Sequence, residues 1–458
     1  MPPIIPESSE ISIGLILLGI AVAICRTGPT VGAYYRLRLG ENCNLLKAFV
    51  SVALAAICLG GRESSVTLSP RAISSPAPPA TLVPQLTRLS HGRVALSWQE
   101  RLKEGGYRFS FAIRDAKGWS VARTIAIGPN LSMFTADLPG IAELPDGALL
   151  AYWELKDMRD GDRYATAIQT AVSRDDGRTW TRPKQPYPDA LSGQHSFLSW
   201  FHSADGVGLV WLDAEQRSLV RHAEMHESRM GSVGLRFADL NANGDLTQQS
   251  FINPITCECC PTGSAVSGRG PVVVYRGRQE PPGTMPSEVQ DDRPTVRDIY
   301  ITRLDNGKWT KPHVVYPDNW VINACPDNGP SVDAAANNLV VGWWTRSNDA
   351  PKVQVAFSAD AGDSLGKPVR VDAGNGEGQV TVALLPDGRS AIVGWLEDGQ
   401  TCARYVASSG MVGNILKLGA SPRHSRLPAW LSTKDGVIVA WTAKAGDGTQ
   451  VEVANLAF

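Results

Sequence analysis

The sequence has almost no excess of charge of either sign and no long run of charged residues. Lys and Arg together number 44 and Asp and Glu 45, which gives a formal net charge of −1 over 458 residues. A nucleic-acid-binding protein would need a basic stripe, and an acidic tail would need a run of carboxylates, so we expect neither. Histidine is also sparse, at seven residues, and no His-rich tract indicates a metal site of that kind.

Long hydrophobic runs are absent except near the N-terminus. Residues 11–25 are apolar but shorter than the roughly 20 residues that span a bilayer. A second run, residues 48–61, follows several basic residues and ends in small ones, the layout of a secretory signal. We therefore expect residues 1–61 to form a signal or anchor region, with lipidation of Cys58 as an alternative. The rest of the chain should lie outside the cytoplasm, in the periplasm or at the cell surface, with membrane contact only through this segment.

Helical periodicity is absent after residue 62. Residues 62–80 are rich in Ser, Pro and Ala, which predicts a linker. From residue 81 a turn, often Asp-Gly, is followed by an apolar run that ends in an aromatic residue. This pattern occurs seven times, with the aromatic at Trp98, Trp153, Trp211, Tyr275, Trp344, Trp395 and Trp441.

Repeats of this length, each holding three or four short strands, are typical of β-propeller blades. The sequence therefore predicts an all-β propeller at residues 81–458, with seven blades, or six if one unit is misread. The last unit lacks an outer strand, which a segment from the N-terminal side could supply. We expect a monomer.

One turn carries a recognisable motif. SRDDGRTW, residues 173–180, matches the Asp box, and residues 358–365 form a weaker copy. The chain therefore resembles the sialidase-like propellers with BNR or Asp-box repeats, and among them a bacterial subgroup with clustered cysteines. The box predicts a structural turn in which Asp175 binds backbone amides, Gly177 takes a positive φ and Trp180 packs on the blade. Its members are Ser173, Asp175, Gly177, Thr179 and Trp180.

The resemblance implies recognition, and hydrolysis, of an acidic glycan at the mouth of the propeller, as in an exo-alpha-sialidase. The first blade lacks the Arg-Ile-Pro motif of sialidases, so we leave open whether the protein is a glycosidase. Candidate catalytic residues gather in the third and fourth units, and they are Asp213, Tyr275, Arg276, Arg278, Glu280, Arg297 and Asp298. Arginines can bind a sugar carboxylate in bidentate fashion. The alternative is an ion-pair network between blades.

Cysteines cluster in two segments. TCECCP contains Cys257, Cys259 and Cys260, and NACP contains Cys325. The segments align as repeats before the inner strands of adjacent blades, so we expect Cys325 to lie near the other three. In an oxidising compartment, two disulfides are the leading interpretation and no cofactor is needed. The alternative is a Cu or Zn ion bound by thiolates, in a non-catalytic cell-envelope module that binds this ion or a protein partner.

Overall fold

The computed structural model describes residues 66–132, 138–159, 165–188, 193–217, 231–290, 293–422 and 427–458. Within these ranges no helix is long and apolar enough to cross a membrane. The predicted signal or anchor region, residues 1–61, lies outside the described residues.

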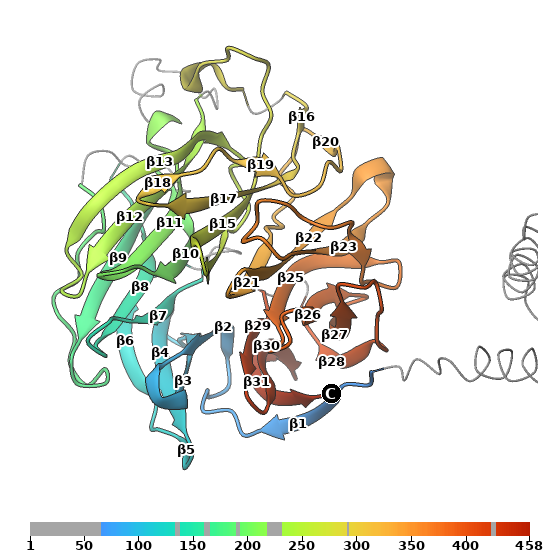
Figure 1. Cartoon of the computed structure of the whole chain (residues 1–458). Helices are drawn as coiled ribbons and strands as arrows, with labels where there is room; N and C mark the ends of the chain where they lie inside the picture. Colours follow the sequence, from blue (N-terminus) through green and yellow to red (C-terminus); the bar gives the residue numbers. More distant parts are fainter. Residues whose placement is uncertain are drawn as a thin grey trace, which may run out of the picture. The chain divides into compact units, whose positions relative to one another are not determined.

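Seven antiparallel sheets follow one another along the chain and form the blades of a propeller (Figure 1). Blade 1 contains β2 (Thr81–Arg88), β3 (Val94–Arg101), β4 (Tyr107–Asp115), β5 (Gly118–Trp119) and β6 (Arg123–Gly128). Blade 2 contains β7 (Gly140–Glu143), β8 (Leu149–Lys156) and β9 (Thr166–Ser173). Blade 3 contains β10 (His195–His202), β11 (Gly206–Asp213), β12 (Val233–Asn241) and β13 (Leu246–Thr256). The seven-bladed all-β fold predicted from the repeats is confirmed.

Blades 4 to 7 continue this order. Blade 4 contains β14 (Gly263–Ser267), β15 (Gly270–Arg276), β17 (Ile299–Asp305), β18 (Lys308–Trp309) and β19 (His313–Val314), and blade 5 contains β21 (Ser331–Ala335), β22 (Asn338–Thr345), β23 (Lys352–Ser358) and β24 (Val369–Arg370). Blade 6 contains β25 (Gly376–Leu384), β26 (Ser390–Glu397), β27 (Gln400–Ala407) and β28 (Leu416–Ala420). Blade 7 contains β29 (Ala429–Thr433), β30 (Gly436–Ala445), β31 (Gly448–Ala457) and β1 (Ser69–Ile73). Between blades 4 and 5, β16 (Thr295–Val296) pairs with β20 (Val321–Ile322). Short 3-10 turns are η1 (Ser90–Gly92), η2 (Pro286–Glu288) and η3 (Ser347–Asp349).

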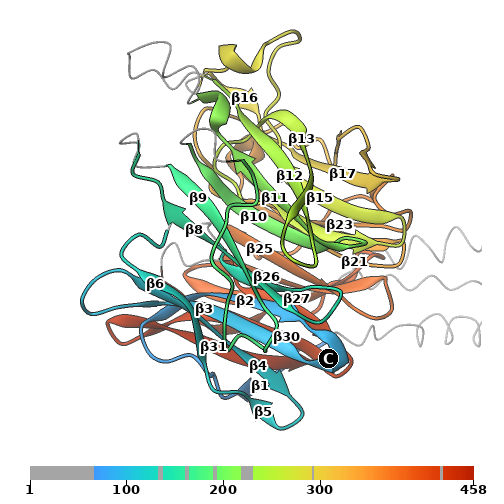
Figure 2. The ribbon, with the colours of Figure 1, turned by 90° about the vertical axis from the view of Figure 1, so that its left-hand side faces the viewer.

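The ring is closed by a strand from the other end of the chain. β1 pairs antiparallel with β31, from Ser69 opposite Ala457 to Ile73 opposite Val453, and the two lie together in both views (Figures 1 and 2). An outer strand supplied from the N-terminal side is therefore confirmed. It lies within residues 62–80, so the strands of the propeller begin before residue 81. The physical reason is that the unpaired edge of β31 offers N–H and C=O groups that an extended segment can satisfy.

The core consists of apolar layers between neighbouring blades. Leu150 of blade 2 shares a cluster with Trp211 of blade 3, and Val274 of blade 4 shares one with Trp343 of blade 5. The runs that end in an aromatic residue form the second strand of each blade. A sheet that is apolar on both faces needs a neighbour on each side, and a ring of blades provides this.

The SRDDGRTW turn is closed by Asp175. Its carboxylate accepts hydrogen bonds from the backbone N–H and the hydroxyl of Thr179, at 2.9 and 2.8 Å. Gly177 has φ +82°, and a Cβ there would lie 2.3 Å from the Phe111 ring, so this position requires glycine. Trp180 packs edge-on against the same ring, with centroids 6.1 Å apart. The turn therefore fixes the end of blade 2 against blade 1.

Candidate functional site

Two loops of neighbouring blades meet at a thiol cluster, defined as Cys257, Cys259, Cys260 and Cys325. The first loop joins β13 to β14 and the second joins β20 to β21. They pass so closely that a Cβ on Gly329 would lie 1.9 Å from the carbonyl oxygen of Pro261. The Sγ atom of Cys325 lies within 4.8 Å of that of Cys259. The proximity predicted from the aligned segments is confirmed.

Three sulfur atoms share one small space without being bonded. Sγ of Cys257 lies 3.9 Å from Sγ of Cys259 and 3.6 Å from Sγ of Cys260. These three side chains are buried, whereas Cys325 is exposed, and the cysteines that the structure describes are free thiols. A disulfide would require an S–S separation of about 2.05 Å.

The surroundings of Cys257 lower the pKa of its thiol, unlike those of its two buried neighbours. Burial alone would raise its pKa, but hydrogen bonding with Cys259 and Cys260 and the positive charges of Arg297 and Arg276 hold the pKa of Cys257 well below its usual range. The contact with Cys257 raises the pKa of Cys259. Burial, followed by the same contact, raises the pKa of Cys260.

A buried ion-pair network borders the thiols. Nη1 of Arg297 lies 2.8 Å from Oε2 of Glu258, and its Nε donates to Thr295 at 2.8 Å. Arg278 lies 3.5 Å from Glu258 and donates to Glu280 at 2.5 Å. Glu258 was not among the residues predicted from the sequence. Its place inside the TCECC motif, between two cysteines, was the signal that could have identified it.

Arg276 connects blade 4 to blade 5. Its guanidinium donates to the carbonyl oxygens of Asn328 (3.0 and 2.8 Å), Arg297 (2.7 Å) and Trp344 (2.7 Å). It also lies over the Trp320 ring, 5.1 Å from the centroid. The side chain is only 2% exposed. All three of its nitrogen atoms are therefore directed at the protein.

The remaining candidates also have partners in the protein. The hydroxyl of Tyr275 accepts a hydrogen bond from Asn253 at 3.0 Å. Asp298 accepts two from backbone N–H groups of the loop before β20, each at 3.2 Å. Asp213, at the end of β11, contacts Arg236 at 3.0 Å. Thus Asp213 lies on blade 3, while the other six lie on blade 4 and its loops. Their part in binding a substrate stays a prediction.

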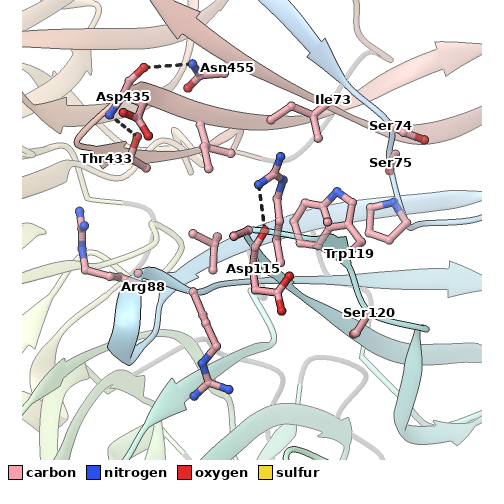
Figure 3. A pocket seen from close by; sticks show the side chains of 18 of the residues that line it. Ile73, Ser74, Ser75, Arg88, Asp115, Trp119, Ser120, Thr433, Asp435 and Asn455 are labelled. Atoms are coloured by element: carbon pink, nitrogen blue, oxygen red, sulfur yellow. Dashed lines mark hydrogen bonds between the residues drawn. The ribbon is translucent and has the colours of Figure 1, made fainter.

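The described residues line a small central hollow and a larger one elsewhere in the ring. The central hollow, of 180 Å³, is lined mainly by the inner strands, including Trp200 of β10 and Trp430 of β29, and by Tyr152 of β8. A larger one of 1340 Å³ lies between blades 7 and 1 (Figure 3). Its charged lining residues are Arg71, Arg88, Arg93, Arg114, Asp115, Lys434 and Asp435. The larger hollow is thus remote in the ring from blades 3 and 4, which carry the candidate catalytic residues.

Comparisons with known proteins give a likeness of fold. No family model and no curated protein matches the chain. Similar solved structures include the Penicillium chrysogenum alpha-L-arabinanase complexed with arabinobiose (12% identity over 86% of this chain and 98% of that one, TM-score 0.43). Others are a PL25 ulvan lyase bound to -[GlcA(1-4)Rha3S]- (9%, 86% and 96%, TM-score 0.47) and a Hadza microbial sialidase (16%, 74% and 66%, TM-score 0.40). The seven-bladed fold itself is shown by the sheets of the chain.

Proposed function

We propose that this propeller binds a soft metal ion, Cu(I) or Zn(II), through the thiol cluster. The separations of the buried sulfurs, 3.6 and 3.9 Å, are the observation that carries the proposal. Thiolates about 2.3 Å from one ion in tetrahedral geometry lie about 3.8 Å apart. The buried sulfurs are therefore spaced as a set of metal ligands, and ligand atoms of Cys325 and Glu258 lie within 4.8 Å of Sγ of Cys259.

The charges around the cluster support the same function. Metal binding requires that Cys259 and Cys260 also lose their protons, and the ion supplies the compensating charge. Arg276 and Arg297 add two positive charges beside Cys257. Soft thiolate ligands select Cu(I) and Zn(II) over hard cations such as Mg²⁺.

Metal content of the full-length chain tests this proposal. After purification under reducing conditions and loading with Cu(I) or Zn(II), we expect Cys257→Ser to lower the content of tightly held metal by about one ion per chain relative to the wild type. Cys402→Ala is the matched control, because Cys402 is a buried thiol of blade 6 whose pKa burial raises to about 12. Absence of a stoichiometric ion from the folded wild-type chain would refute the proposal.

The disulfide alternative has its own measurement. If the chain is exported, as residues 1–61 predict, its thiols meet an oxidising compartment. Mass mapping of protein recovered from that compartment identifies any bonded pair among Cys257, Cys259, Cys260 and Cys325. Two disulfides there would replace metal binding as the use of these residues.

Recognition of an acidic glycan is the second candidate, and the hollow in Figure 3 is the observation that favours it. Arg71 and Arg88 lie at this hollow and are exposed, although Arg88 also donates a hydrogen bond to the carbonyl oxygen of Ser432, whereas Arg276 is buried. Guanidinium groups bind carboxylates and sulfates in bidentate geometry. Calorimetry with uronic-acid oligosaccharides should show binding that Arg88→Ala weakens and the exposed control Arg182→Ala does not. A fluorogenic sialoside that is not turned over would remove the hydrolase part.

A further inference from the structure

We propose a second metal site, on blade 3, in which His195, Asp213 and Glu215 hold a divalent transition-metal ion such as Zn²⁺. His195 begins β10 and pairs with Asp213, the last residue of β11. Glu215 follows two residues later. One ligand atom from each residue lies within 4.8 Å of the other two. This site is independent of the thiol cluster and uses harder ligands, the nitrogen and oxygen donors that suit Zn²⁺.

The hydrogen bond of His195 determines its tautomer. Nδ1 lies 3.0 Å from the carbonyl oxygen of Thr166, which can only accept, so Nδ1 carries a proton. Nε2 has no hydrogen-bond partner, although the side chain is only 2% exposed. The ring is stacked on Tyr187, with centroids 4.6 Å apart. Histidines that bind metals are oriented in this way, by donating the other N–H to a carbonyl or carboxylate.

The distances from Nε2 fit an ion better than a hydrogen bond. Nε2 lies 3.8 Å from Oδ2 of Asp213 and 3.7 Å from Oε1 of Glu215. A hydrogen bond would bring nitrogen and oxygen to about 2.7–3.2 Å. Ligands about 2.0–2.2 Å from a shared zinc ion in tetrahedral geometry lie about 3.3–3.6 Å apart, slightly less than these separations. The three side chains are therefore separated by the space that a small cation fills.

The competing arrangement is a protonated imidazole. Burial alone would lower the pKa of His195, but Glu215 and Asp213 outweigh it and raise the pKa. Arg236 lies 3.0 Å from Asp213 and 2.9 Å from Glu215, so it balances one of the two carboxylates. Either a proton on Nε2 or a metal ion can balance the other. The long distances from Nε2 to both carboxylates favour the ion.

A zinc titration distinguishes a bound metal ion from a protonated His195. The titration uses ZnCl₂ and the full chain with Cys257→Ser, so that the thiol cluster does not contribute whether or not it binds metal. We expect one zinc ion per chain, with affinity lowered at least tenfold by His195→Gln. The matched control is His202→Gln, at the exposed far end of the same strand.

Glu215→Gln provides a second variant, because Glu215 is only partly buried and its loss should not prevent folding. We expect it also to weaken zinc binding at least tenfold. Absence of zinc binding by the folded Cys257→Ser chain would overturn the proposal. Zinc binding that neither His195→Gln nor Glu215→Gln weakens would overturn it as well.

Discussion

Replacing Arg276 with methionine tests whether this side chain joins blade 4 to blade 5. Methionine keeps an apolar body but donates no hydrogen bond, so the carbonyl oxygens of Asn328, Arg297 and Trp344 lose a donor. Each buried polar group left without a partner costs about 1–3 kcal/mol. The variant also avoids the cost of burying the guanidinium. We therefore take the low end of the range for each carbonyl and expect unfolding to become easier by about 3 kcal/mol.

Differential scanning calorimetry measures this loss. For a propeller the size of Ser65–Phe458, the unfolding entropy is about 0.8 kcal/mol/K, so the melting temperature should fall by about 4 °C. The control Arg182→Met removes an exposed arginine and should shift stability by no more than about 0.5 kcal/mol. An Arg276→Met chain that melts within about 1 °C of the wild type would refute the role assigned to these bonds.

Three further predictions concern the blades. Gly177 and Gly147 have nearly the same φ, +82° and +83°, but only a Cβ on Gly177 would contact an aromatic ring, that of Phe111. The Gly177→Ala chain should therefore have a lower melting temperature than the Gly147→Ala chain, and equal melting temperatures would contradict the packing argument. Hydrogen bonds, first from the backbone of Thr179, lower the pKa of Asp175 to about 2. Because this lies below the unfolded value of about 3.9, its stabilisation is present above pH about 4 and is lost as the pH falls towards about 2. The difference in melting temperature between the wild type and Asp175→Asn should shrink over that window, and a constant difference would count against it. Deleting β1 should lower the melting temperature and promote association of chains through the freed edge of β31. If the deleted chain is a monomer by size exclusion and its melting temperature by calorimetry is unchanged, β1 does not close the ring.

The repeats carried most of the information about the fold. Seven aromatic-ended runs predicted seven blades because each blade needs one strand that is apolar on both faces, and such a strand is visible in sequence. The missing outer strand of the last unit likewise predicted closure by a segment from the N-terminal side. The linker boundary was less visible, since β1 has a largely exposed sequence, SPRAI, that pairs only because β31 has a free edge.

The site was predicted in its residue types but not in their contacts. The clustering of Cys325 with Cys259 followed from the aligned segments. The partners of Arg276 did not, because they are backbone carbonyls, and every residue has one. The orientation of His195 similarly depends on a carbonyl in β9 that no side-chain pattern reveals. Sequence therefore indicated where the polar residues gather, whereas the structure shows which of their atoms are already bonded.

The thiol cluster and the junction between blades 4 and 5 form one structure. The hydrogen bonds of Arg276 hold the loop of Asn328 against β15, and its charge, together with that of Arg297, favours the thiolate of Cys257. A change at Arg276 should therefore alter both the folding stability and the pKa of Cys257, a ligand of the proposed metal site. Cys257→Ser leaves every hydrogen bond of Arg276 to a carbonyl in place, because none of them involves the sulfur. Metal binding can thus be separated from stability at the cysteine, but not at the arginine that supports it.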